Sequence, residues 1–264
     1  QEALLRVLRG EAAPESVGAM LMLMRMKGEM PSEIAGFTAA LRAGLTAVPT
    51  PDLDWPSYAA GRTRGLPWFL LSARLVALGG YKVLMHGWNG LGENGHLIRE
   101  GLPFAGIEIC DSPRVARDTM ERAGIAYLPL EHFSPELLRL LQLRADFGLR
   151  SCLNTVARML NPGGARASVQ GVFHPPYREL QADASALLGH GQSWEALFPP
   201  AGEEARRLND GETDVSRLSD LWHGRLDDPF SEAIVLSTAA LALDTLGEAS
   251  PEEMAHRLWV NRLG

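Results

Sequence analysis

Apolar residues recur at helical spacing throughout residues 1–47. The segment Ser16 to Met26 is apolar on nearly every side, which predicts a helix that is buried against other helices. Another helix is predicted to begin at Pro31, because proline favours the first helical turn and apolar residues follow at helical intervals. The pattern therefore predicts a small helical bundle, followed by a proline-rich linker over residues 47–56.

Residues 54–95 alternate polar loops with short apolar elements. We expect a polar, arginine-bearing loop up to Gly65, an apolar helix over Pro67–Leu78 and a strand over Lys82–Met85. A second loop, punctuated by glycines, begins at His86. Rigid elements hold the polar groups of neighbouring loops in place, and this stretch is therefore the predicted ligand site.

Helices and short strands continue to alternate further along the chain. Serine-proline pairs, which favour helix starts, predict helices at residues 113–123, 137–147 and 251 onwards. Apolar periodicity predicts further helices over residues 149–160, 177–188 and 232–246, and strands over 125–128 and 167–173. Residues 189–230 show no clear period.

Composition is that of an ordinary folded soluble protein, with 264 residues, 46% of them hydrophobic and 22% charged. The two cysteines lack CxxC spacing, which argues against a disulfide framework or a zinc site and favours a reducing, cytoplasmic compartment. No apolar run reaches the roughly 18 residues of a membrane span, and we expect no signal peptide and no membrane partner. Because the helical pattern is already under way at Gln1, we expect further residues upstream.

Arginine supplies almost all of the positive charge, since only Lys27 and Lys82 among the 25 basic residues are lysines. Basic residues gather over 56–86 and 137–168, whereas residues 195–232 are rich in acid. The planar guanidinium suits phosphate and carboxylate, which favours an anion-binding face; a general preference for arginine on solvated faces explains the same pattern. The formal net charge of −7 argues against a general nucleic-acid binder.

Four segments resemble those of a known family. In chain order they are MRMKGEMPSEIAGFTAALR at residues 24–42, KVLMHG at 82–87, FGLRSCLNTVARMLNP at 147–162 and QGVFHPPYRELQADASALLG at 170–189. Their content and order resemble the anthranilate phosphoribosyltransferases and the related pyrimidine nucleoside phosphorylases. The resemblance covers nearly the whole chain.

The resemblance implies an α/β fold with a small helical-bundle domain and a larger α/β domain, whose central mixed sheet is flanked by helices. It places residues 1–47 and 134–160 in the helical domain, and residues 48–133 and 161–264 in the α/β domain. It also implies a cleft that binds phosphoribosyl pyrophosphate with magnesium on one side and an aromatic acid on the other. A homodimer formed through the helical domain is the implied assembly.

The chain departs from this family where phosphate is bound. The family's Gly-Thr-Gly-Gly-Asp loop is represented by residues 54–65, with glycines only at Gly61 and Gly65, and its Asn-Ile-Ser-Thr by the Pro-Trp-Phe-Leu of residues 67–70. The lysine before His86 is replaced by Met85. Glycines let backbone amides approach phosphate, and hydroxyl groups donate hydrogen bonds to it. The replacements therefore weaken the expected binding site for phosphoribosyl pyrophosphate. The pattern resembles a divergent branch, the YbiB-type (TrpD-like) proteins, which is linked to nucleic-acid binding through a basic groove and not to tryptophan synthesis.

Most candidate site residues are expected to contact an anion or phosphate. These are Arg62, Arg64, His86, Asn89, Arg144 and Arg150. A turn histidine bonded to backbone, and arginines on one helix face paired with nearby acids, would explain His86, Arg144 and Arg150 without a ligand.

Two further kinds of candidate complete the set. Tyr58 and Trp88 are candidates for stacking a nucleic-acid base, whereas Trp68 fits a core position better. Glu203 and Glu204 are weak candidates for a magnesium site, because two adjacent carboxylates alone do not define a metal geometry.

Two functions from different classes follow. The first is a non-enzymatic homodimer that binds a polyanion, a nucleotide or nucleic acid through its arginines. The second is a phosphoribosyl or glycosyl transferase with an altered substrate, which would use magnesium. A scaffold dimer whose apolar helices form the partner surface is a third alternative.

Overall fold

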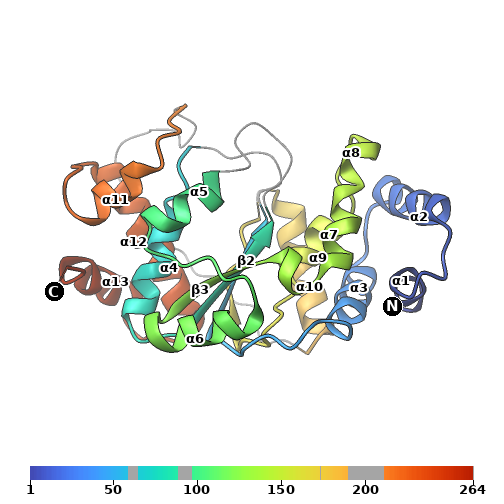
Figure 1. Cartoon of the computed structure of the whole chain (residues 1–264), viewed down its shortest axis with the longest axis horizontal. Helices are drawn as coiled ribbons and strands as arrows, with labels where there is room; N and C mark the ends of the chain where they lie inside the picture. Colours follow the sequence, from blue (N-terminus) through green and yellow to red (C-terminus); the bar gives the residue numbers. More distant parts are fainter. Residues whose placement is uncertain (59–64, 89–96, 173, 190–210, 264) are drawn as a thin grey trace.

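The computed structural model describes residues 1–58, 65–88, 97–172, 174–189 and 211–263. The helical part of the molecule lies around the N-terminus, on the right of Figure 1. It consists of α1 (Glu2–Leu8), α2 (Pro14–Lys27), α3 (Pro31–Arg42), α7 (Pro135–Gln142), α8 (Arg144–Phe147) and α9 (Leu153–Arg158). Within it α3 contacts α1 and α9, while α7 contacts α8 and α9. The predicted helical bundle is thus present, and the helix predicted over 137–147 is divided in two.

A parallel sheet forms the centre of the larger part. Its strands are β1 (Leu53–Tyr58), β2 (Val83–Trp88), β3 (Ile125–Pro129) and β4 (Ala167–Ser168), in the order β3-β2-β1-β4. Leu53 pairs with Val83 and with Ala167, and Val83 pairs with Ile125. Where a mixed sheet was expected, every described pair is parallel, because each strand is followed by a helix that returns the chain to the same end of the sheet.

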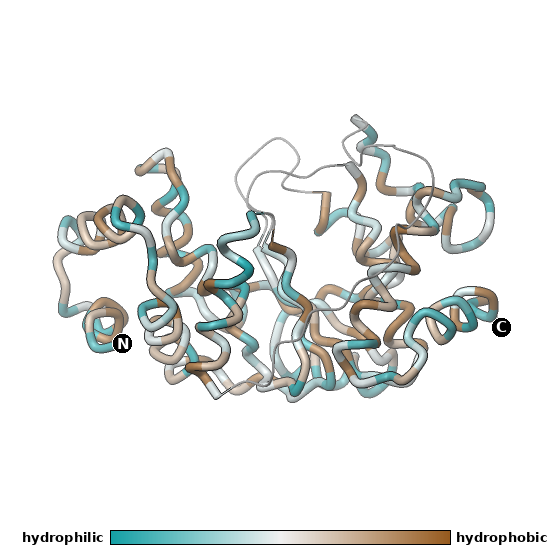
Figure 2. Tube along the Cα trace, turned by 180° about the vertical axis from the view of Figure 1, so that it is seen from behind, coloured by the Kyte–Doolittle hydropathy of each residue, from teal (hydrophilic) through white to brown (hydrophobic). Residues whose placement is uncertain are grey.

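The remaining helices surround the sheet. They are α4 (Phe69–Leu78), α5 (Leu97–Phe104), α6 (Pro113–Ala123), the 3₁₀ turn η1 (Leu130–His132), α10 (Pro175–Leu187), α11 (Ser216–Trp222), α12 (Pro229–Leu246) and α13 (Pro251–Val260). α12 contacts both α4 and α13, and α10 packs on α3 of the helical part. Figure 2 shows the molecule from behind, with hydrophobic and hydrophilic residues alternating along the outer helices, as expected for helices with one buried side.

The strand β1 is the main correction to the sequence-based picture, which placed a linker over residues 47–56 and a loop from Asp54. All six residues of β1 are buried, and it pairs with β2 along its whole length. Pro56 does not prevent this pairing. The carbonyl of Asp54 accepts from the amide of Val169 on the β4 side, so Pro56, two residues on, also faces that side, beyond the last paired residue of β4.

Two hydrophobic clusters cover the two faces of the sheet. The first joins the helical part to one face, and includes Leu21, Ile34 and Phe37 together with Leu84 and Leu128. The second fills the space between the other face and the helices α4 and α12. The two cysteines are buried free thiols that belong to the first cluster.

Within the described residues, α12 alone is long and apolar enough to cross a membrane, with 18 residues and a mean hydropathy of 1.2. Polar and charged residues, among them Glu232 and Asp244, interrupt its apolar stretch, so it is not an unbroken apolar run. Its buried residues include Val235, Ala239 and Leu243, which belong to the second cluster. α12 therefore has the packing of a core helix.

Candidate functional site

The carboxyl ends of β1 and β2 are where an open parallel sheet binds ligands. These strands end at Tyr58 and Trp88. Three predicted site residues, Arg62, Arg64 and Asn89, come directly after these ends and lie outside the described residues. The geometry of the site is therefore built from the strands and from the helices that border them.

A hydrogen-bonded network lies on the face of the sheet turned toward the helical part. His86 on β2 pairs in register with Pro56 on β1, and so Asp54 and Tyr58, one pleat before and after, share its face. The distance from His86 Nε2 to Asp54 Oδ1 is 2.9 Å, and that from Nδ1 to the Tyr58 hydroxyl is also 2.9 Å. The hydroxyl of Ser168 on β4 donates to Asp54 Oδ2 at 2.8 Å. The network thus joins three adjacent strands.

The charge of the His86 ring sets the direction of these hydrogen bonds. An ionised Asp54 only accepts, so Nε2 of His86 donates to it; Nδ1 accepts from the Tyr58 hydroxyl in a neutral ring and donates to it in a charged one. Burial raises the pKa of Tyr58 well above its ordinary value, which keeps the phenol protonated. The His86 ring also meets the Phe133 ring edge-on, with centroids 5.7 Å apart. The imidazole is held in one orientation.

These contacts bear on three predicted roles. His86 is fully buried with both ring nitrogens occupied, so a direct phosphate contact would require this network to open. Tyr58 is only 9% exposed, and its hydroxyl is engaged with His86. Trp88 is partly buried against the first cluster. The side chains of His86, Tyr58 and Trp88 are thus all engaged or partly buried. The contact of His86 with phosphate and the stacking of a base on Tyr58 or Trp88 each stay a prediction.

The opposite face carries a second polar group near the same edge. Tyr127 on β3 is fully buried, and its hydroxyl has no hydrogen-bond partner; the Ser57 hydroxyl on β1 is likewise buried and unpartnered. Between them Gly87 allows close approach, because a Cβ there would overlap the Ser57 carbonyl oxygen and stand 3.2 Å from the Tyr127 hydroxyl. Burial raises the pKa of Tyr127, and the ion pair of Arg99 and Glu131 lies close enough to influence it.

The amino end of α4 occupies the position that the sequence comparison assigned to phosphate-binding hydroxyls. Trp68 and Leu70 are buried in the second cluster, and the Phe69 ring stacks on Trp55 with centroids 6.5 Å apart. No side chain caps this helix end. The amides of Trp68, Leu70 and Leu71 already donate to nearby carbonyls, at 2.9–3.0 Å. This helix end therefore offers apolar side chains and few free amides, and Trp68 is a core residue as expected.

Arg144 and Arg150 lie in the helical part and are both half-buried. They do not share a helix face, because Gly148 ends α8 with a φ of 64° and α9 begins only at Leu153. The two arginines therefore belong to different segments. Their predicted anion contacts are not tested by this geometry.

The predicted metal ligands Glu203 and Glu204 lie outside the described residues. Among the residues that the structure describes, no group of three histidine, cysteine, aspartate or glutamate side chains is arranged to hold a metal ion.

Sequence reasoning did not single out Asp54 or Ser168 as site residues. The signal for Asp54 was present, because it alternates with Leu53 and Trp55 in the manner of a strand, but prolines on either side suggested a linker. Ser168 could be found only from the pairing of β1 with β4.

Comparison with known proteins identifies relatives of this chain in sequence and in fold. Residues 1–44 match the model of the helical bundle domain of a glycosyl transferase family. The fold is similar to that of the anthranilate phosphoribosyltransferase (TrpD) of Thermus thermophilus, with a TM-score of 0.82 at 23% identity, covering 98% of this chain and 88% of that one. It is also similar to the Saccharomyces cerevisiae anthranilate phosphoribosyltransferase in complex with PRPP and Mg, with a TM-score of 0.69 at 17% identity, covering 92% of this chain and 81% of that one. At these identities the two likenesses establish the fold.

Curated relatives extend the likeness to the sequence. The anthranilate phosphoribosyltransferase of Methanosarcina acetivorans is 31% identical over 223 residues, 83% of this chain, of which the chain spans 59%. That of Phenylobacterium zucineum is 32% identical over 253 residues, which are 95% of this chain and 73% of that protein. The chain therefore belongs to the anthranilate phosphoribosyltransferase-like glycosyltransferase family.

Proposed function

We propose that this chain is a binding protein of glycosyltransferase fold, which takes a polyanion, a nucleotide or nucleic acid and does not act in tryptophan synthesis. The observation that carries the proposal is the amino end of α4, where buried aromatic and aliphatic side chains stand in place of hydroxyls and the local amides are already bonded. Each charge-assisted contact to phosphate contributes about 1.5–3 kcal/mol. Loss of two such contacts would weaken donor binding by roughly 100-fold or more.

Arginine supplies the remaining capacity for anions. Arg62 and Arg64 follow β1 in sequence and lie outside the described residues. Arg144 and Arg150 are half-buried on the helical part. A guanidinium binds phosphate with two parallel hydrogen bonds, and it does not need the glycine-rich backbone that a pyrophosphate loop requires. The proposed ligand is therefore recognised by side chains.

Binding measured at low salt tests this proposal directly. We expect the chain to retain labelled single-stranded DNA, duplex DNA or RNA, with an affinity that falls as salt rises because counterions are released from phosphate. The double substitution Arg144→Gln, Arg150→Gln should weaken that binding at least tenfold and make it less salt-dependent. Arg114→Gln is the matched control, since Arg114 is an exposed arginine on α6 whose partner is Asp118. Absence of binding to all three nucleic acids would end the nucleic-acid form of the proposal.

A second candidate is a phosphoribosyl or glycosyl transferase with an altered substrate. It is favoured by the 32% identity to a curated anthranilate phosphoribosyltransferase over 95% of this chain. Magnesium would then be the cofactor, with Glu203 and Glu204 as its weak candidate ligands. Calorimetry with phosphoribosyl pyrophosphate, with and without magnesium, separates the candidates, because heat and a thermal shift that require magnesium are expected only for the transferase. Rescue of a tryptophan auxotroph lacking its own transferase would likewise overturn the binding-protein proposal.

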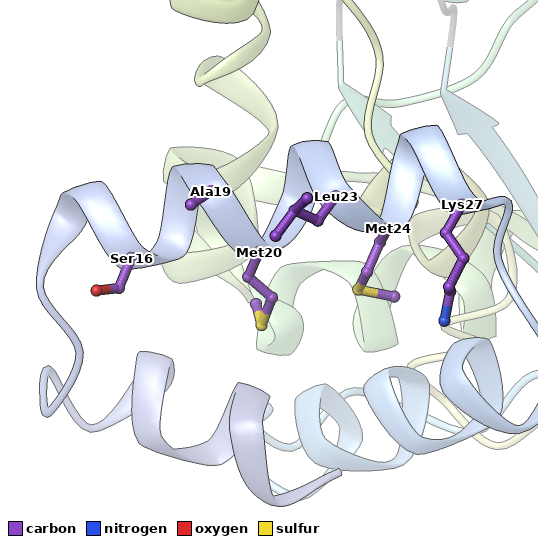
Figure 3. A pocket seen from close by; sticks show the side chains of 6 residues that line it. All are labelled: Ser16, Ala19, Met20, Leu23, Met24 and Lys27. Carbon is purple, nitrogen blue, oxygen red and sulfur yellow. The ribbon is translucent and has the colours of Figure 1, made fainter.

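We further propose a homodimer formed through the helical part, in the cytoplasm. On α2, Leu23 and Met26 are 69% and 82% exposed. Figure 3 shows the side chains that line a hollow of about 480 Å³ along this helix, namely Ser16, Ala19, Met20, Leu23, Met24 and Lys27. Exposed apolar surface of this kind favours a protein partner. Light scattering should give a dimer for the unmodified chain and a monomer for Leu23→Glu with Met26→Glu, while Leu187→Glu on α10 serves as the control.

A further inference from the structure

Four buried polar atoms without a hydrogen-bond partner lie around Gly87, at the carboxyl end of β2. They are the hydroxyl oxygens of Ser57 and Tyr127, Nε of Arg99 and Oε2 of Glu131. The part of the chain that the structure describes contains nine such atoms, so nearly half of them are in this one place. Buried polar groups in folded proteins ordinarily find a partner, and a cluster of exceptions therefore indicates a group that the cluster binds.

Ser57 and Tyr127 approach each other across β2. Ser57 pairs in register with Gly87, and Tyr127 pairs with Met85 two residues earlier, so both side chains lie on the face of the sheet that the second cluster covers. A Cβ on Gly87 would stand 1.9 Å from the Ser57 carbonyl oxygen and 3.2 Å from the Tyr127 hydroxyl oxygen. The sum of these distances limits the separation of the two oxygens to 5.1 Å. Tyr127 therefore reaches over Gly87 toward the end of β1.

The ion pair of Arg99 and Glu131 lies beside these hydroxyls. Arg99 Nη2 donates to Glu131 Oε1, which leaves Nε and Oε2 unused. Burial is the main cause of the raised pKa of Tyr127, but the Arg99 charge lowers this pKa and the Glu131 charge raises it, so both charges are close to the phenol. The turn η1, which carries Glu131, also contacts β2.

The four side chains differ in their access to solvent. The Arg99 and Glu131 side chains are 36% and 31% exposed, whereas Ser57 and Tyr127 are buried. The ion pair is therefore the part of the cluster that a ligand meets first, and the two hydroxyls are its interior part.

The cluster offers a ligand no net charge. Arg99 and Glu131 neutralise each other; Nε can only donate, Oε2 can only accept, and each hydroxyl can do either. A fully ionised phosphate only accepts hydrogen bonds, and the Glu131 carboxylate would repel it. A neutral group that both donates and accepts suits these four atoms, whereas a bare phosphate does not.

We propose that Ser57, Arg99, Tyr127 and Glu131 form a subsite for the neutral part of a nucleotide, either a sugar hydroxyl or the amide edge of a base. Arg99 would donate through Nε and Glu131 would accept at Oε2, while the two hydroxyls would bond to the same group. This subsite rests on the proposed function, and it narrows the ligand from any polyanion to a molecule that carries a nucleoside.

Matched ligands test the subsite. Calorimetry of the full chain, at low salt and without magnesium, compares uridine and guanosine triphosphates with inorganic triphosphate, which lacks the nucleoside. We expect at least one nucleotide to bind tighter than inorganic triphosphate by roughly tenfold or more. The 2′,3′-dideoxy form of that nucleotide distinguishes the two sources of the neutral group. An affinity close to that of inorganic triphosphate indicates the sugar hydroxyls, and an affinity close to that of the nucleotide indicates the base.

Variants assign the preference to these residues. Ser57→Ala with Tyr127→Phe removes two hydroxyls that have no partner among the described residues, so we expect the melting temperature at neutral pH to be kept. The affinity for the preferred nucleotide should fall by about fivefold or more, and that for inorganic triphosphate should stay the same. Thr38→Val is the matched control, since it removes a buried hydroxyl from α3 in the helical part, and it should bind both ligands as the unmodified chain does.

The outcomes separate this subsite from the proposed function. Equal affinities for the nucleotides and inorganic triphosphate would overturn the subsite and leave an anion-binding protein. Failure of every ligand to bind would overturn both. An unchanged preference in the double variant, or an equal loss for nucleotide and inorganic triphosphate, would likewise refute the subsite. If the double variant did not fold, the ring signals of Tyr127 in the unmodified chain would decide, because they must shift with the nucleotide and not with inorganic triphosphate.

Discussion

Asp54 accepts a hydrogen bond at each of its carboxylate oxygens, one from His86 and one from Ser168, and it is fully buried. A buried carboxylate depends on its donors, and each donor here depends on the carboxylate. At the scale of single residues, this network bonds both ring nitrogens of His86 to interior groups, at a residue for which the family resemblance implies a ligand contact.

Replacement of Asp54 by asparagine should lower the free energy of unfolding by about 1.5–3 kcal/mol, because a neutral amide cannot accept two charge-assisted hydrogen bonds. Urea unfolding followed by tryptophan fluorescence measures the change. Asp118→Asn, at an exposed position on α6, should stay within about 0.5 kcal/mol. Equal losses in the two variants would contradict the importance assigned to the network.

Tyr58 and Tyr127 predict a loss of stability at alkaline pH. Burial raises the pKa of both tyrosines in the folded chain above the ordinary value of about 10, so their contribution is complete below that pH. Above it the unfolded chain loses protons first, and stability should fall by up to about 1.4 kcal/mol per pH unit for each tyrosine. The free energy of unfolding, measured between pH 9 and pH 11, should fall less steeply with pH in the double variant Tyr58→Phe, Tyr127→Phe than in the unmodified chain. Parallel curves for the two proteins would disprove this.

At the scale of elements, β1 and β2 are the pair on which the candidate site is built. Their close pairing near Ser57 requires a residue without a side chain on the neighbouring strand, and Gly87 meets this need. The network on one face and the unpartnered Tyr127 hydroxyl on the other both depend on this register.

Gly87→Ala should therefore destabilise the protein by about 1–3 kcal/mol or more, because its methyl group would overlap the Ser57 carbonyl. Gly171→Ala is a matched control, since a Cβ there meets nothing within 4 Å. Thermal unfolding of the two variants gives the comparison. If Gly87→Ala melted together with Gly171→Ala, the strands would be further apart than described.

The sequence predicted some elements well because their signals are local. Gly124 ends α6 with a φ of 74°, and α4, β3 and α12 lie close to their predicted positions. The sequence did not predict β1 because Pro56 suggests a loop. The strand tolerates Pro56 because β4 is short, and β4 lies more than a hundred residues further along the chain. For the same reason the bonds of Asp54 with Ser168, and the enclosure of His86, could not be predicted from spacing. They arise from pairing between distant segments.

At the scale of the whole molecule, the helical part and the sheet are joined by one continuous hydrophobic cluster. Ile34 and Phe37 of α3 belong to the same cluster as Leu84 of β2 and Leu128 of β3. α10 adds to this continuity, since it packs on α3. The domain boundary predicted near residue 47 therefore separates two segments of chain that share a core.

Removal of residues 1–44 should leave a chain that does not fold, because it exposes the apolar surfaces of α9 and α10 on which α3 packs. Near-ultraviolet circular dichroism of the shortened chain should lack the native signal. In the full chain, urea unfolding should proceed in a single transition for both tryptophan fluorescence and far-ultraviolet dichroism. Two separate transitions, or a shortened chain with native dichroism, would refute this coupling.

The shared cluster also has a consequence for inheritance. A recombination event that exchanged residues 1–44 between two relatives would transfer the helices without the residues of α9 and α10 against which α3 packs. Such a hybrid gene would encode well-formed helices beside a mismatched pair of partner helices. We therefore expect that the helical segment was inherited together with α9 and α10, and that grafting this segment onto another relative requires the facing residues of α9 and α10 to be chosen along with it.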